Sequence, residues 1–245
     1  KLHPRITGTA KRLWLIYVTL TLVVMGALWL SGLSFYDAIN HAFTTAATGG
    51  FSTKNESVAA FESPLVHYII IIFMFIGGMN FTLIYFAAHG RLKPLWKNDE
   101  LKYYLWTVLL LTGFLTIYLI IDGHGHLETA FRDVLFQVVA IITTTGYATA
   151  DYTAWAPHAT FIFFLLMFTG ASAGSTSGGV KIIRHVMLLK NGFTEFKRML
   201  HHRAIIPVRL NGRAVPDKVI YNIQAFIILY VLIFLVSVGI MLMDG

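Results

Sequence analysis

Two short polar stretches in a very apolar chain carry the residues best suited to chemistry. They read Thr48-Gly49-Gly50-Phe51 and Thr144-Thr145-Gly146-Tyr147. Each offers hydroxyl and carbonyl oxygens, which are hard ligands suited to an alkali cation. Each also holds a glycine, whose backbone adopts angles that a side chain would resist, so that carbonyls can aim inward. The sequence therefore predicts two ion-contacting loops, each with an aromatic residue that packs outward and braces it.

Both stretches belong to an internal repeat. Residues 35–55 align without a gap over residues 131–151, so that Asp37 meets Asp133 and Gly50 meets Gly146. The parts before the polar loops, residues 35–47 and 131–143, are too short to cross a membrane as helices, which indicates re-entrant segments. We expect both aspartates in the first helical turn, where a carboxylate is favourable, and the negative helix end at the loop, where it attracts cations. A pair of ordinary polar connections is the alternative interpretation.

The composition predicts the elements that position these loops. Hydrophobic residues make up 56% of the 245 residues and charged residues 13%, against about a quarter in a typical soluble domain. Five apolar runs approach the ~20 residues that a spanning helix needs; they are residues 13–33, 65–88, 103–121, 159–189 and 220–242. We therefore expect an all-α polytopic membrane protein with five membrane spans and two re-entrant pore loops, in which the second run is an uninterrupted helix.

The charge pattern predicts the orientation. All of the 19 Lys and Arg residues except Lys54 and Arg132 lie in residues 1–12, 90–102 and 181–218. Such alternation between membrane crossings is the positive-inside pattern, so the amino terminus is expected in the cytoplasm. The basic residues do not line one groove, so nucleic-acid binding is not expected.

Several chemistries are not supported by the residues present. The chain has no cysteine, which removes disulfides, thiolate metal sites and cysteine nucleophiles. Its ten histidines form no ligand constellation, and we expect them at surfaces or interfaces. The spans hold almost no ionisable residues that could act as a paired acid, base or nucleophile. We therefore expect no enzyme activity and no cofactor in this chain.

The apolar run at residues 159–190 is interrupted by a polar, glycine-rich insertion at residues 170–179. Gly170, Gly174 and Gly178 could form a close-packing helix motif. A phosphate loop is a weak alternative because Val180 stands where the lysine should be. The third interpretation is a break in the helix, with unwound backbone below the loops. Lys181 and Arg184, just beyond, either anchor the cytoplasmic helix end or control ion exit.

Thr144-Thr145-Gly146-Tyr147-Ala148 looks like a degraded copy of the TVGYG filter of potassium channels, and Thr48-Gly49-Gly50-Phe51-Ser52 like a second. The chain resembles the Trk-type potassium uptake proteins of the Trk/Ktr/HKT superfamily. The resemblance implies K+ uptake through a channel-like pore, with Gly50, Gly146 and their neighbours holding K+ by backbone oxygens. It also implies an intramembrane gating loop whose candidate residues are Gly170, Ser172, Gly174, Ser175, Thr176, Ser177, Gly178 and Gly179. A homodimer, a cytosolic nucleotide-binding regulatory subunit and the bacterial inner (cytoplasmic) membrane are further implications.

The resembled family has four helix–pore loop–helix repeats, which suggests how this chain is organised. We expect a cytoplasmic segment (residues 1–12), a first repeat (13–90), a cytoplasmic linker (91–102), a second repeat with a broken last helix (103–190), a basic cytoplasmic connector (191–217) and the first helix of a further repeat (218–245). The natural chain is then expected to be longer. An alternating-access, ion-coupled symporter is the alternative function, although repeats in the same membrane orientation favour a pore. The degraded filter predicts weaker discrimination against sodium.

Overall fold

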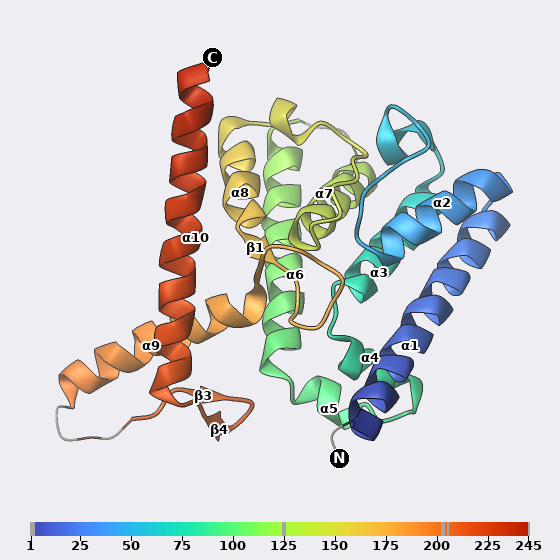
Figure 1. Ribbon diagram of the computed structural model, residues 1–245. Helices are drawn as coiled ribbons and strands as arrows, with labels where there is room; N and C mark the ends of the chain where they lie inside the picture. Colours follow the sequence, from blue (N-terminus) through green and yellow to red (C-terminus); the bar gives the residue numbers. More distant parts are fainter. Residues whose placement is uncertain (1–2, 124–125, 202–203, 205, 245) are drawn as a thin grey trace. The chain divides into compact units, whose positions relative to one another are not determined.

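The computed structural model describes residues 3–123, 126–201, 204 and 206–244 and falls into two compact units, Lys1–Ile182 and Ile183–Gly245 (Figure 1). In chain order the first unit holds α1 (His3–Leu30), α2 (Phe35–Ala46), η1 (Ser57–Ala60), α3 (Pro64–Gly77), α4 (Phe81–Ala88), α5 (Lys93–Trp96), α6 (Asp99–Ile121), α7 (Leu127–Ile142), η2 (Tyr152–Ala154), α8 (Pro157–Met167), β1 (Thr169–Gly170) and β2 (Val180–Lys181). The second holds α9 (Ile182–Leu200) from its second residue on, β3 (Arg209–Leu210), β4 (Arg213–Ala214) and α10 (Asp217–Asp244).

The apolar runs form membrane-length helices in three places. Ala10–Leu30, Asp99–Ile121 and Asp217–Met243 are each long and apolar enough to cross a bilayer as one helix. The pair α3 and α4 passes the same test only together, and α8 is apolar but only 11 residues long. The all-α membrane fold class is thus confirmed, with two of the five predicted spans broken.

The prediction of an uninterrupted helix over residues 65–88 is wrong. The chain bends by 109° between α3 and α4. Asn80 starts the new helix, since its side-chain oxygen accepts a hydrogen bond from the Thr82 amide at 2.8 Å. Gly78 sits where a β-carbon would lie 2.6 Å from the Tyr104 hydroxyl and 2.8 Å from a Thr143 methyl group. The break therefore brings bare backbone against the second repeat.

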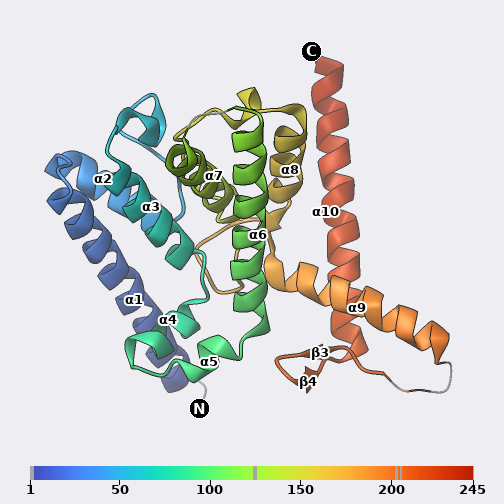
Figure 2. The same cartoon turned by 180° about the vertical axis from the view of Figure 1, so that it is seen from behind.

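Each repeat is a long helix, a short re-entrant helix and a return to the same side, as Figures 1 and 2 show for α1–α2–α3 and α6–α7–α8. Ser34 caps α2 by accepting from the Asp37 amide, and Asp37 lies in the first turn as predicted. In the second repeat α7 begins earlier than predicted, at Leu127, so Glu128 occupies the first turn and Asp133 does not. The two repeats pack together where α3 contacts α7.

The second unit pairs an amphipathic helix with a long apolar one. The Arg184 guanidinium of α9 lies 3.7 Å from the centroid of the Phe226 ring of α10. Between these helices β3 and β4 form an antiparallel hairpin, whose turn residues Asn211 and Gly212 both have positive φ. Lys190 of α9 donates to the Arg209 carbonyl at 3.1 Å, which ties the hairpin to the helix.

Candidate functional site: two pore loops and the loop beside them

The two polar loops share an unusual backbone. Thr48 and Thr144 have φ of +50° and +56°, and Gly50 and Gly146 have φ of +71° and +78°. These are equivalent positions of the repeat, and a left-handed threonine costs about 1–2 kcal/mol. A residue with positive φ at every second position turns successive peptide planes toward one side, whereas an ordinary strand alternates them. Strain repeated at the same place in both loops is typical of a functional site.

The two loops also contact each other. A β-carbon on Gly50 would lie 1.8 Å from the Thr145 carbonyl oxygen, so the chain of the first loop passes directly against the backbone of the second. Gly146 has no atom within 4 Å of its corresponding position, so its glycine is required by φ alone. The structure thus brings the predicted loop residues of the two repeats together.

Both loops begin at the carboxyl ends of short helices. The cap residues are Ala47 for α2 and Thr143 for α7. The last carbonyls of a helix carry the negative end of its dipole, which stabilises a nearby cation. No group of three or more His, Asp or Glu residues that could hold a metal ion occurs among the residues that the structure describes. The oxygens that the two loops themselves offer are backbone carbonyls and threonine hydroxyls.

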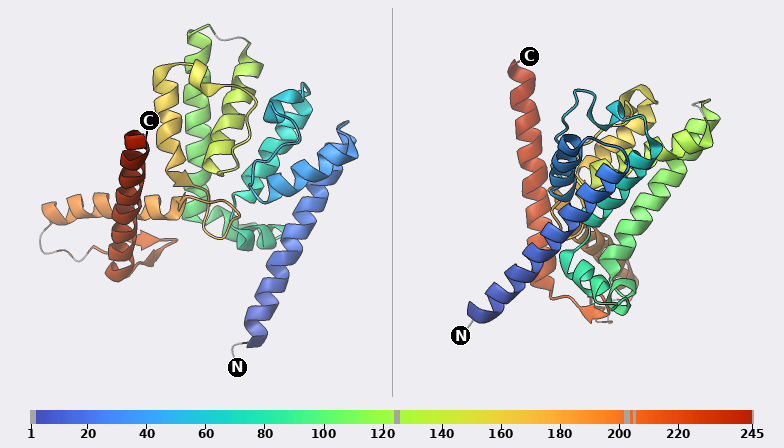
Figure 3. Two further views of the ribbon diagram at one scale, coloured as in Figure 1. Left: turned by 45° about the horizontal axis from the view of Figure 1, so that its top comes forward. Right: turned by 90° about the vertical axis from the view of Figure 1, so that its right-hand side faces the viewer.

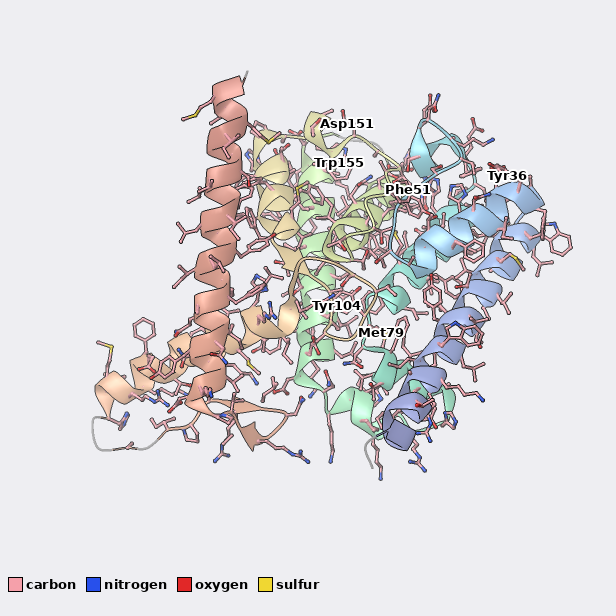
Figure 4. All side chains as sticks on the ribbon, viewed as in Figure 1. Tyr36, Phe51, Met79, Tyr104, Asp151 and Trp155 are labelled. Atoms are coloured by element: carbon pink, nitrogen blue, oxygen red, sulfur yellow. The ribbon has the colours of Figure 1, made fainter. Side chains whose placement is uncertain are left out.

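Tyr147 is the aromatic brace that the sequence predicts. It is 1% exposed, and its hydroxyl is hydrogen-bonded to the Thr44 hydroxyl of the other repeat and lies 3.4 Å from the His41 carbonyl. Phe51, the equivalent residue, which is labelled in Figure 4, is 77% exposed. The aromatic residue of the second loop is therefore buried against the other repeat, whereas that of the first loop is exposed in this chain.

His41 and Gln137 occupy equivalent positions of the two re-entrant helices and fasten the chain that follows each loop. The His41 Nδ1–H donates to the Asp37 carbonyl at 2.8 Å, which leaves Nε2 to accept from the Ser52 hydroxyl at 2.9 Å. Gln137 donates to the Ala150 carbonyl at 3.0 Å. His41 and Gln137 were not singled out from the sequence. The signal that could have found them is that both repeats carry a polar side chain at this position.

The prediction that histidines lie at surfaces or interfaces is wrong for two of them. His41 is 0% and His67 7% exposed, and the His67 Nε2 lies 2.7 Å from the Phe61 carbonyl. The His41 ring also packs edge-on against Phe61 and the His67 ring against Phe136. Both ring nitrogens of His41 are hydrogen-bonded, whereas the buried Nδ1 of His67 has no hydrogen-bond partner within the described part of the chain.

Asp37 links the two ends of the first re-entrant segment. It lies in the first turn of the short helix α2 and not in a membrane-spanning helix. Its carboxylate accepts hydrogen bonds from the hydroxyls of Thr53 and of Ser34, the latter at 2.7 Å, and lies 3.8 Å from the Lys54 ammonium. These partners, Thr53 foremost, hold the pKa of the Asp37 carboxyl below its ordinary value of 3.8. The carboxylate therefore ties the start of α2 to the chain beyond the loop.

The glycine-rich insertion forms a closed loop between β1 and β2. These strands pair in parallel, Thr169 with Val180 and Gly170 with Lys181, so that the two ends of residues 171–179 meet. A β-carbon on Gly170 would lie 2.3 Å from the Gly178 carbonyl oxygen, which explains the glycine at this crossing. The helix break predicted here is thus present, and the close-packing helix motif does not apply because these glycines lie outside helices.

This loop is fastened to the first repeat and to the second polar loop. The Ser172 amide donates to the Gly78 carbonyl at 3.0 Å, and the Phe81 amide donates to the Gly174 carbonyl at 3.0 Å. The Gly178 amide donates to the Thr144 hydroxyl at 2.6 Å. Figure 4 labels Tyr104 and Met79, which lie at about the same height in that view as the insertion. The insertion therefore lies directly against the polar loop of its own repeat.

The two basic residues beyond the insertion have different surroundings. The Lys181 ammonium donates to the Ser177 carbonyl and lies 3.1 Å from the Ser177 hydroxyl. Arg184 instead packs on Phe226 within the second unit. Lys181 thus belongs to the loop, whereas Arg184 anchors α9 on α10.

Re-entrant helices, paired polar loops and membrane-length helices define a polytopic α-helical membrane protein with pore loops. The family model described as TrkH, cation transport protein, matches residues 1–244, and the chain belongs to this family. It is 39% identical to the Trk system potassium uptake protein TrkH of Salmonella typhimurium over 97% of this chain and 50% of that protein. TrkG of Escherichia coli is 33% identical over 95% of this chain and 48% of its own length.

A solved structure agrees with this assignment. The crystal structure of the potassium transporter TrkH from Vibrio parahaemolyticus superposes with a TM-score of 0.89 at 37% identity, covering 95% of this chain and 51% of that one. The chain therefore spans about half the length of the relatives it matches.

Proposed function

We propose that the natural gene product containing this chain takes up potassium through a channel-like pore, and that Thr48–Phe51 and Thr144–Tyr147 contribute two of its filter segments. The observation that carries the proposal is the positive φ at the same two positions of both loops. A backbone that turns its carbonyls to one side offers a row of oxygens that replaces the hydration shell of an alkali cation. Relatives named as potassium uptake proteins point to the ion.

Residues 171–179 are proposed as the gate of this pore. They form an irregular segment between the apolar α8 and the amphipathic α9, and such backbone is tolerated at membrane depth only where it lines water or is buried in protein. Their contact with the Thr144 hydroxyl supports a position at the inner end of the filter. Weaker sodium discrimination, a homodimer and a cytosolic nucleotide-binding regulator, all expected from the sequence, stay predictions.

The test is growth of an uptake-deficient bacterium at limiting potassium. Gly146→Asp in the natural gene product is expected to abolish rescue, because the strain and charge fall in the filter. Gly90→Asp is the matched control: Gly90 also has a positive φ, +71°, and open space around it, but lies in the connection after α4. Deletion of residues 173–177 is expected to leak ions. Rescue by Gly146→Asp equal to that of Gly90→Asp would place Gly146 outside the ion path.

A further inference from the structure

A buried carboxylate outside the polar loops holds the glycine-rich insertion. Glu100 lies in the first turn of α6, is 3% exposed, and accepts a hydrogen bond from the Ala173 amide at 2.6 Å. Asp37 and Glu100 are the two acidic residues buried among the residues that the structure describes. Burying a carboxylate is costly unless it is paired, so its position needs a specific partner. That partner is the backbone of the insertion.

Glu100 binds the first half of the insertion, because its carboxylate accepts the hydrogen bond of the Ala173 amide. The second half is held by Lys181, whose ammonium donates to the Ser177 carbonyl. The carboxylate thus ties the first half of the insertion to the start of α6. Charge-assisted hydrogen bonds are about twice as strong as neutral ones.

The other fastenings of the insertion are of a different kind. Ser172, Gly174 and Thr176 bond to backbone groups of Gly77, Gly78 and Phe81, where one repeat meets the other. The insertion is rich in Ser, Thr and Gly and has few apolar side chains to hold it, so a single strong anchor has a large share in its stability. Removing the acceptor would also leave the Ala173 amide without its partner.

We infer that Glu100 is a positioning residue that holds residues 171–179 in the closed position, and that loss of its carboxylate favours the open pore. This inference rests on the proposed function, because it assigns the regulation of the same gate. Glu100 does not touch the polar loops, so it should set how often the pore opens and leave the ion path itself unchanged.

Single-channel recording of the natural gene product in planar bilayers separates these quantities. Glu100→Ala is expected to raise the ratio of open to closed time about tenfold, with unitary K+ conductance and the K+/Na+ reversal potential unchanged. Glu100→Gln keeps an acceptor oxygen and should show a smaller rise, and Asp99→Asn, one residue away on α6, none. An unchanged ratio in Glu100→Ala, or altered conductance at an unchanged ratio, overturns the inference.

A thiol-labelling experiment tests the same inference without measuring ion flux. The sequence has no cysteine, and Ser175 is half-buried with its hydroxyl 2.6 Å from the Ser172 carbonyl. With any other cysteines of the gene product removed, Ser175→Cys should react with a water-soluble thiol reagent about tenfold faster in the Glu100→Ala background. If that variant does not fold, Glu100→Gln should still raise the rate at least twofold. Equal rates overturn the inference, whereas absent current in the parent protein overturns only the proposed function.

Discussion

Gly50 and Gly146 hold the same place in their repeats but meet different surroundings. Gly146→Ala adds a methyl group in open space and should cost about 1–2 kcal/mol through its positive φ alone. Gly50→Ala should cost more, because the methyl group also collides with the Thr145 carbonyl. Thermal unfolding in detergent and potassium-limited growth measure both. A larger loss in Gly146→Ala would contradict the packing of the two loops described here.

Tyr147 tests whether the brace between repeats acts through its hydroxyl. Tyr147→Phe keeps the buried ring and removes the hydrogen bond with Thr44, so we expect a stability loss of about 1 kcal/mol. We also expect a shift of the K+/Na+ reversal potential toward weaker selectivity. Tyr36→Phe, a change of the same atoms at an exposed site, is the control. If Tyr147→Phe and Tyr36→Phe gave the same stability and the same reversal potential, packing of the Tyr147 ring alone would be enough to brace the loop.

Asp37 gives the first loop a pH dependence. Its pKa is lowered in the folded protein, so its contribution to stability is present above the ordinary value of 3.8 and is lost as pH falls through the folded pKa. The melting temperature of the parent protein should therefore fall more steeply below about pH 4 than that of Asp37→Asn. Asp133→Asn is the control. Burial raises the pKa of Asp133, so removing its carboxyl group should not make the fall of the melting temperature at acid pH less steep. Parallel curves of melting temperature against pH for the parent protein and Asp37→Asn would contradict a stabilising role of the Asp37 carboxylate.

At the scale of elements, the break between α3 and α4 depends on one of two adjacent glycines. A β-carbon on Gly78 would meet Tyr104, Thr143 and Ala171 at 2.6–3.0 Å, whereas one on Gly77 would meet its neighbours at ordinary distances of 3.5 Å or more. Gly78→Ala should therefore destabilise the protein by about 1–3 kcal/mol through overpacking. Gly77→Ala should have little effect. Equal melting temperatures for the two variants would show that the atoms around Gly78 can shift to admit a methyl group at little cost.

The elements differ in how far the sequence foretold them. Length and repetition predicted the re-entrant α2, and the polar glycine-rich insertion predicted the break after α8. The bend at Gly78 was missed because the apolar run was taken as one helix, although Gly78 and the helix-capping Asn80 are local signals of a break. The early start of α7 was missed because the alignment with α2 placed both helix ends at equal positions.

The site, too, could be predicted only in part. The unusual backbone of Thr48, Gly50, Thr144 and Gly146 could be anticipated from composition and repetition, and their role as a filter stays a prediction. Glu100 could not be anticipated, because an acid at the start of a helix is ordinary and its partner Ala173 lies far along the chain.

At the scale of the whole molecule, the distribution of basic residues predicts which connections face the cytoplasm. Substituted cysteines test this in intact cells. Glu56→Cys, in the exposed connection before α3, should react with a membrane-impermeant thiol reagent from outside. Lys97→Cys, exposed between α5 and α6, should react only after permeabilisation. The reverse pattern would invert the proposed orientation.

The pairing of β1 with β2 bears on how fast residues 171–179 can move. Figure 3 gives two further views of the ribbon. Because the two ends of residues 171–179 are tied together, the segment can swing at its tip while its ends stay joined and neighbouring helices keep their length. Loop motions of this size take nanoseconds to microseconds, whereas helix register shifts take microseconds to milliseconds. If residues 171–179 are the gate, as we propose, we expect it to open and close fast, and slow regulation to act by changing how strongly the tip of the segment is held.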